Sequence, residues 1–148
     1  MDEIEKKVNH VLVRLINEIW KCEEKVLITE EFQDLTNTDM HVIEAVGLGS
    51  GDTMTPIAKR LNVTVGTLTT SMNRLVSKGY VIRTRSEADR RIVQVHLTER
   101  GIAAYHHHED YHRRMTRGII ERLGPEQLPV LEDMLDALVH FFEENQNK

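Results

Sequence analysis

The chain has 148 residues, of which 40% are hydrophobic, and its formal net charge at pH 7 is −5. This length allows a buried core, and we expect a single domain over residues 1–148. No apolar run approaches the eighteen or more residues of a membrane span, and the acidic start MDEIEKKVNH argues against a secretory signal. One cysteine cannot form an internal disulfide and suits a reducing cytosol, so we expect a cytoplasmic protein without membrane contact.

Two helices are predicted in the first third of the chain. From Ile4 to about Ile28, apolar residues recur at helical spacing, which favours a long amphipathic helix. A shorter helix is expected over residues 40–46, with Thr38-Asp39 as its N-cap and Gly47 after its last residue.

A helix-turn-helix is predicted next. Ile57, Ala58 and Leu61 fit the buried side of a short helix, and Asn62-Val63 fits a brief turn. The helix that follows has an apolar stripe, and its opposite face presents small polar groups with positive charge toward the C-terminus: Thr64, Gly66, Thr67, Thr70, Ser71, Arg74 and Lys78. A helix in the DNA major groove needs such a surface, because short polar side chains reach base edges and phosphates. These residues are therefore predicted to bind DNA.

After Gly79, which supplies a helix stop, the apolar period changes from 3.6 to 2. Two strands around residues 81–85 and 92–97 flank a polar tip, which is the form of a wing. An arginine at a thin β tip can enter the minor groove, where narrow A·T-rich segments concentrate negative potential. We expect the wing to contribute five residues to the DNA-binding surface: Arg83, Arg85, Asp89, Arg90 and Arg91.

The charge distribution supports this interpretation. Residues 53–100 carry nine Lys/Arg against three Asp/Glu, a net charge of +6. Residues 1–52 are at −7 and residues 101–148 are at −4. A basic surface on an otherwise acidic protein favours DNA binding at that face and limits non-specific DNA binding elsewhere.

Two further helices are predicted at the C-terminal end. Thr98 is a plausible cap for a helix from Glu99 toward Leu123, and a last amphipathic helix begins near Glu126. The fold class is thus mainly α with a small antiparallel β wing (α+β). Residues 53–98 form the winged helix-turn-helix, and residues 1–30 and 99–148 form long dimerisation helices. A two-fold homodimer would place two recognition helices about 34 Å apart on a pseudo-palindromic operator in double-stranded DNA.

The order of elements, the LTxxG phrase at residues 97–101 and the DRR phrase at residues 89–91 resemble the MarR family of winged-helix repressors. The resemblance covers essentially the whole chain and implies that Asp89 orients Arg91. Met40-His41 and the phrases at residues 63–71, 78–80 and 85–91 are similar to a fatty-acid-biosynthesis repressor within that family. This similarity implies control of type II fatty-acid-synthesis genes, with long-chain acyl-acyl carrier protein as corepressor. The alternative is a MarR-type repressor that responds to a free small molecule, a metal or an oxidant.

A protein-borne acyl corepressor requires an apolar pocket and a docking surface for an acidic carrier protein. The candidates for the pocket are Ile16, Trp20 and Met40, although each also suits ordinary core packing. The docking candidates are Arg113, Arg114 and Arg117, for which solvated helix charge is the alternative.

The histidine-rich segment and Cys22 carry the other reactive side chains of the chain. His108 and His112, in a histidine-rich segment with His106 and His107, are one helical turn apart, a spacing that can chelate zinc or nickel. Because no cysteine is near, we expect exposed histidines and no metal site. Cys22 lacks a preceding tyrosine and is expected to be an unreactive thiol. No catalytic motif occurs, so we expect neither an enzyme nor a cofactor.

Overall fold

The computed structural model describes residues 1–27, 29, 31–49 and 51–146. Its elements, in chain order, are α1 (Glu3–Leu27), α2 (Asn37–Val46), α3 (Met54–Leu61), α4 (Val65–Ser77), β1 (Val81–Arg85), β2 (Val93–Leu97), α5 (Glu99–Ile120) and α6 (Gln127–Gln146). The predicted fold class and order of elements are confirmed. The chain forms two compact units, residues 1–109 and residues 110–148, and α5 contributes to both.

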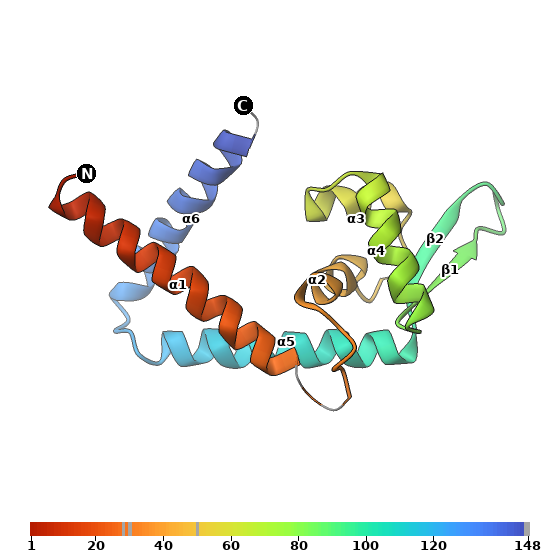
Figure 1. Cartoon of the computed structure of the whole chain (residues 1–148), viewed down its shortest axis with the longest axis horizontal. Coiled ribbons are helices and arrows are strands. Elements are labelled where there is room, and N and C mark those ends of the chain that lie inside the picture. The colour runs from red at the N-terminus through yellow and green to blue at the C-terminus, as the bar shows by residue number, and fades with distance from the viewer. Residues whose placement is uncertain (28, 30, 50, 147–148) are drawn as a thin grey trace. The chain divides into compact units, whose positions relative to one another are not determined.

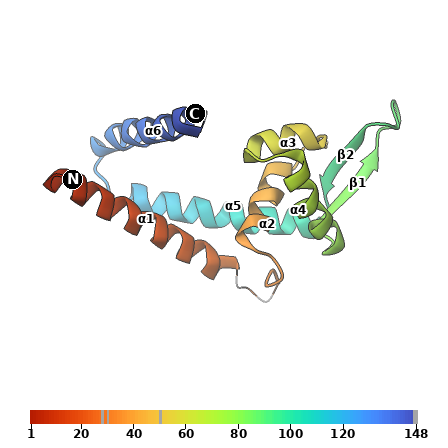
Figure 2. The same ribbon diagram turned by 45° about the horizontal axis from the view of Figure 1, so that its top comes forward.

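The hydrophobic core of the first unit lies where α2, α3 and α4 meet the base of the hairpin. Figures 1 and 2 show these three helices gathered together, with β1 and β2 projecting from them. Leu68, Met72 and Leu75 of α4 are at most 1% exposed, which confirms most of the apolar stripe predicted for this helix. Val65, at the start of α4, is 42% exposed and does not belong to the core.

The N-terminus of α2 differs from the prediction. Thr38-Asp39 was expected to cap the helix, but the N-cap is Thr36, whose side chain accepts a hydrogen bond from the amide of Asp39 at 3.1 Å. The Asp39 carboxylate in turn accepts from the amide of Thr36 at 3.1 Å, which completes a capping box. The sequence Thr36-Asn37-Thr38-Asp39 offers several capping residues, and the reciprocal pair satisfies two backbone amides instead of one.

The hairpin is antiparallel and pairs Val81 with Leu97 and Arg85 with Val93. At its base, Thr98 caps α5 as predicted, because its hydroxyl accepts from the amide of Gly101 at 3.1 Å. Gly101 is buried against the preceding strand, and a Cβ at this position would lie 2.1 Å from the carbonyl oxygen of Tyr80. The glycine of the LTxxG phrase therefore allows α5 to approach the chain between α4 and β1.

The terminal helices expose much of their apolar surface. In α1, Val8, Val11, Leu15 and Ile16 are each about half exposed, and no residue of α6 is buried in the described structure. The first helix was predicted to end near Ile28, which lies outside the described residues. The helix predicted to reach Leu123 ends at Ile120, and α6 begins at Gln127. Among the described residues, no helix is long and apolar enough to cross a membrane.

Candidate DNA-binding site

The outer face of α4 is the first part of the site. Its N-cap is Thr64, whose hydroxyl accepts from the amide of Thr67 at 3.1 Å. Gly66, Thr67 and Thr70 are exposed, whereas Ser71 is half-buried. The uncapped amides at a helix N-terminus attract anions, so this end of α4 suits a DNA phosphate as well as base edges.

Two basic residues that were predicted to face DNA form ion pairs with a buried carboxylate. Arg74 donates to Oδ1 of Asp39 from Nε at 2.9 Å and from Nη2 at 2.7 Å. Lys78 donates from Nζ to Oδ2 of the same carboxylate at 3.0 Å. Asp39 is 0% exposed, so both cations neutralise a buried charge and attach α4 to the first turn of α2.

The titration of Asp39 reflects these contacts. Burial alone would raise the pKa of its carboxyl, but the amide of Thr36 and the side chains of Lys78 and Arg74 outweigh burial, so the pKa lies below its ordinary value. The carboxylate is therefore charged at neutral pH. Because Arg74 retains a 42% exposed side chain, its outer edge still contributes positive charge to the face of α4.

The tip of the wing holds one arginine in a defined orientation. Asp89 accepts from the amide and Nε of Arg91 through Oδ1, and from Nη2 through Oδ2, each at 3.1 Å. The Arg91 side chain is nevertheless 92% exposed. Its hydrogen bonds lower the pKa of the Asp89 carboxyl, which keeps the pair ionised. The geometry thus presents a fixed guanidinium to solvent, in the arrangement that the family resemblance implied.

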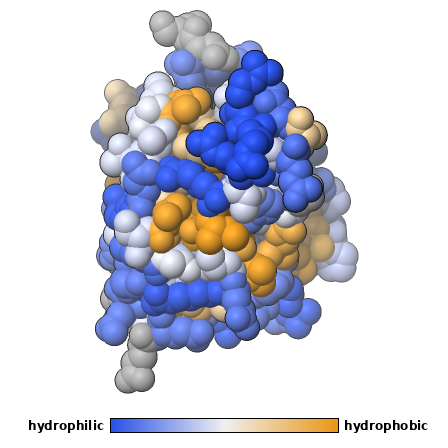
Figure 3. All heavy atoms as spheres, turned by 90° about the vertical axis from the view of Figure 1, so that its right-hand side faces the viewer, coloured by the Kyte–Doolittle hydropathy of each residue, from blue (hydrophilic) through white to orange (hydrophobic). Residues whose placement is uncertain are grey.

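The other arginines of the wing have local partners. Arg83 donates to the side-chain oxygen of Asn73 at 2.7 Å and so connects the wing to α4. Arg85 donates to the carbonyl oxygen of Arg90 at 2.8 Å, across the tip. Arg90 itself is exposed. Figure 3, which looks onto the wing side of the molecule, shows strongly hydrophilic residues over most of this face, with smaller apolar patches between them.

A second polar cluster, which the sequence analysis did not identify, supports the base of the wing. The Tyr80 hydroxyl donates to Asp34 at 2.6 Å, and burial together with this carboxylate raises the pKa of Tyr80. Arg100 lies 4.3 Å from the centre of the Tyr80 ring and donates to both oxygens of Asp34 at 3.3 Å. The segment before α2 is thereby attached to the residue that precedes β1 and to α5.

The three predicted effector residues lie in different surroundings. Met40 is 1% exposed and packs in the core, whereas Ile16 is 50% exposed on α1. Trp20 is 53% exposed. It lines an open hollow together with Glu24, which is also on α1, and with Leu35 and four neighbouring residues before and at the start of α2. Trp20 thus borders a hollow in the described part of the chain. The docking candidates Arg113, Arg114 and Arg117 are all exposed on α5.

Comparison with known proteins agrees with this geometry. The MarR family profile matches residues 33–92. A crystal structure of FabT from Streptococcus pneumoniae in complex with DNA has a TM-score of 0.88 and 36% identity, over 95% of this chain and 98% of that one. The regulator SarZ of Staphylococcus aureus strain USA300 is 39% identical over 70 residues, so the chain spans about half (47%) of the length of that curated relative. The MepR–DNA complex of S. aureus, at 21% identity and a TM-score of 0.73, shares the fold over 89% of this chain and 96% of that one.

The fold and the exposed recognition helix define a winged-helix DNA-binding transcriptional regulator. The similarity to FabT extends over nearly all of both chains, and the chain accordingly belongs to the MarR family.

Proposed function

We propose that this chain is a repressor that binds a pseudo-palindromic operator as a homodimer and controls genes of type II fatty-acid synthesis. The proposal is supported by the exposed polar face of α4 together with the Asp89–Arg91 pair at the tip of the wing. The similarity to FabT, which was solved with DNA, supports the fatty-acid role that the sequence phrases implied.

The homodimer is supported by the terminal helices. A soluble monomer rarely exposes contiguous apolar stripes of this size, and α6 exposes Val130, Met134, Leu135, Val139, Phe141 and Phe142, each by about half or more. A second copy of the chain would cover these residues and set the spacing of the two recognition helices to about one DNA turn.

Long-chain acyl-acyl carrier protein is the corepressor in this proposal. Each buried CH₂ of an acyl chain contributes about 0.8 kcal/mol, so the response should increase with chain length. Trp20, beside its open hollow, is the favoured pocket residue, and Arg113, Arg114 and Arg117 are the docking residues for the acidic carrier.

The test is an anisotropy titration of labelled operator DNA with the full chain. Long-chain acyl-carrier protein should raise operator affinity, short-chain forms should raise it less, and the unacylated carrier should leave it unchanged. Equal affinity across the series would contradict the corepressor role and leave DNA binding intact. Failure of the chain to prefer any operator over random DNA would contradict the repressor itself.

A further inference from the structure

A short connection joins the recognition helix to the wing. Helix α4 ends at Ser77 and strand β1 begins at Val81, so residues 78–80 carry the chain from one of these elements to the other. We call these three residues the joint. Its central residue, Gly79, has a φ of +82°, a left-handed conformation that favours glycine. The direction in which the wing leaves α4 is therefore set within a few bonds.

Two residues from other parts of the chain bind the joint. Arg100, in the first turn of α5, donates from Nη1 to the carbonyl oxygen of Lys78 at 2.9 Å, and its guanidinium lies over the Tyr80 ring. Asp34, in the segment before α2, accepts from the Tyr80 hydroxyl at 2.6 Å, and its backbone carbonyl accepts from Nζ of Lys78. The Asp34 carboxylate and the Arg100 guanidinium also form an ion pair at 3.3 Å. Together they hold both ends of the joint.

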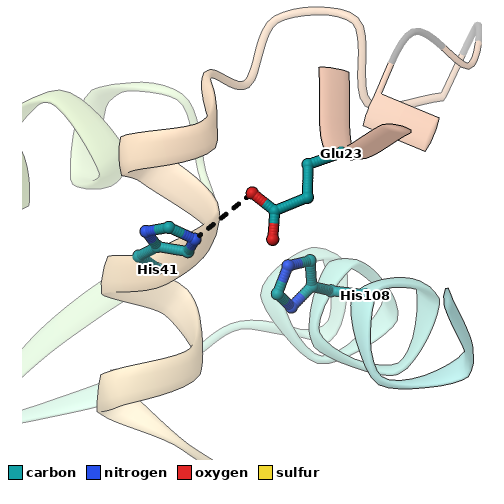
Figure 4. A group of neighbouring side chains, drawn as sticks. All are labelled: Glu23, His41 and His108. Atoms are coloured by element: carbon teal, nitrogen blue, oxygen red, sulfur yellow. Dashed lines mark ion pairs between the residues drawn. The ribbon is translucent and has the colours of Figure 1, made fainter. Parts of the chain in front are cut away.

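The segment that carries Asp34 is itself fixed in the unit formed by residues 1–109. Phe32 and Leu35, on either side of Asp34, are 3% and 7% exposed and belong to the hydrophobic core. The helix that follows is in turn attached to α1, where Oε2 of Glu23 is 3.9 Å from Nε2 of His41 (Figure 4). Asp34 thus binds the joint from a rigid support.

The ion pair is more exposed than a pair that serves the core. The side chains of Asp34 and Arg100 are 37% and 46% exposed. Ion pairs in contact with solvent contribute little to the stability of a fold. An orientation that is set before binding, in contrast, avoids the cost of ordering the wing when DNA is bound.

We propose that Asp34 and Arg100 are positioning residues for DNA binding, which hold the wing at the angle to α4 that lets the two elements bind neighbouring grooves together. Neither residue needs to touch the DNA. The duplex fixes the distance between its major and minor grooves, so a wing that leaves this angle must be ordered again on binding. The inference rests on the proposed contact of Arg91 with DNA.

A double-mutant cycle tests the role, with the full chain and a duplex that the wild type selects from a random-sequence pool. Arg91→Ala alone should weaken binding roughly 5–150-fold. In the Asp34→Ala background this effect should be at least about fivefold smaller, because a misdirected wing contributes little. Thr67→Ala, on α4, should cost the same in both backgrounds. Arg100→Gln in place of Asp34→Ala should give the same pattern.

The sign of the Asp34→Ala effect separates orientation from charge. Removing an acidic group should by electrostatics alone tighten DNA binding. Asp34→Ala should instead weaken it, roughly 2–10-fold, at a temperature where circular dichroism shows every variant to be folded. Glu18→Ala is the matched control, since Glu18 is also exposed and paired, with Lys21 at 3.3 Å on α1. This control should bind DNA no more weakly than the wild type.

A measurement without DNA examines the angle itself. Spin labels are placed on cysteines at the exposed positions Thr69 of α4 and Glu87 of the wing tip, in a Cys22→Ser chain diluted with unlabelled chain. The distance distribution should be narrow, and Asp34→Ala should broaden or shift it.

An unchanged distribution in Asp34→Ala, or an Arg91→Ala effect of equal size in both backgrounds, overturns the positioning role. A silent Arg91→Ala in the wild type contradicts the contact between wing and DNA and removes the positioning role with it. Failure to select any duplex contradicts the proposed repressor, and the spin-label distances then still decide whether Asp34 directs the wing.

Discussion

At the scale of single residues, Asp39 connects the second helix to the recognition helix. Its buried carboxylate completes the capping box of α2 and accepts hydrogen bonds from Arg74 of α4 and from Lys78 at the C-cap of α4. Charge-assisted hydrogen bonds of this kind are stronger than neutral ones, and removing one partner leaves the others unsatisfied. The orientation of α4 therefore depends on a residue outside the helix-turn-helix.

Asp39→Asn should lower the free energy of unfolding by about 2–3 kcal/mol at pH 7. Because the folded pKa of Asp39 is below the ordinary 3.8, its stabilising contribution is complete above that pH and is lost as the pH falls further. The difference between wild type and variant should accordingly shrink below pH 3.8. Urea unfolding at a series of pH values measures it, and a difference that is constant down to pH 2 would contradict the role of the ionised carboxylate.

Asp89 and Arg91 allow the wing to be tested with two related substitutions. Arg91→Ala should weaken operator binding by about 1–3 kcal/mol and flatten its dependence on salt, because the protein then brings one positive charge fewer to the DNA. It should also raise the pKa of Asp89 toward its ordinary value. Asp89→Asn keeps the cation but removes its orientation, so affinity should fall while the salt slope is retained. Lys7→Ala, on α1, is the control, and unchanged affinity in both wing variants would exclude the wing from DNA binding.

At the scale of elements, α4 has two faces with different functions. Thr67→Ala and Thr70→Ala should reduce operator affinity and leave the melting temperature almost unchanged, since both residues are exposed. Leu68→Ala should cost about 2–5 kcal/mol of stability, because Leu68 is 1% exposed in the core. Calorimetry and anisotropy on the same samples distinguish the effects. If the threonine variants unfold and Leu68→Ala loses no stability, the assignment of the polar and buried faces of α4 is wrong.

The start of α5 makes a second prediction at this scale. A methyl group at position 101 would clash with the backbone carbonyl of Tyr80, which cannot rotate away as a side chain can. Gly101→Ala should therefore destabilise the fold by about 1–3 kcal/mol or more, although alanine favours helices. Gly118→Ala, later in α5 and without such a clash, is the control. A higher melting temperature in Gly101→Ala than in the wild type would contradict the close approach of α5 to Tyr80.

The elements themselves were largely predictable from the sequence because they depend on local periodicity. The apolar stripe of α4, the change to a period of two at Val81 and the cap at Thr98 all involve neighbours within a few residues. The partners of Arg74 and Lys78 were not predicted, since Asp39 is 35 and 39 residues away and only packing brings it there. The T-x-x-D spacing from Thr36 was a readable capping-box signal that would have located the helix start.

At the scale of the whole molecule, the proposed dimer should be needed for tight operator binding. Leu135→Glu combined with Val139→Glu places two charges on an apolar stripe of α6, where both residues are about half exposed. We expect a monomer in sedimentation, helicity like that of the wild type, and operator affinity reduced at least tenfold, because two half-sites no longer bind together. Asp133→Ala, on the same helix, should remain dimeric. A variant that stays dimeric would exclude this face of α6 from the interface.

The short helix α2 supports the recognition helix from outside the helix-turn-helix. Its first turn carries Asp39, which accepts hydrogen bonds from Arg74 and Lys78 of α4. A displacement of α2 must therefore displace α4 as well or break these charge-assisted bonds. Thermodynamic linkage then requires reciprocity. If a ligand that displaces α2 changes operator affinity by some factor, operator DNA must change the affinity for that ligand by the same factor, and titrations run with and without DNA would measure the coupling from either side.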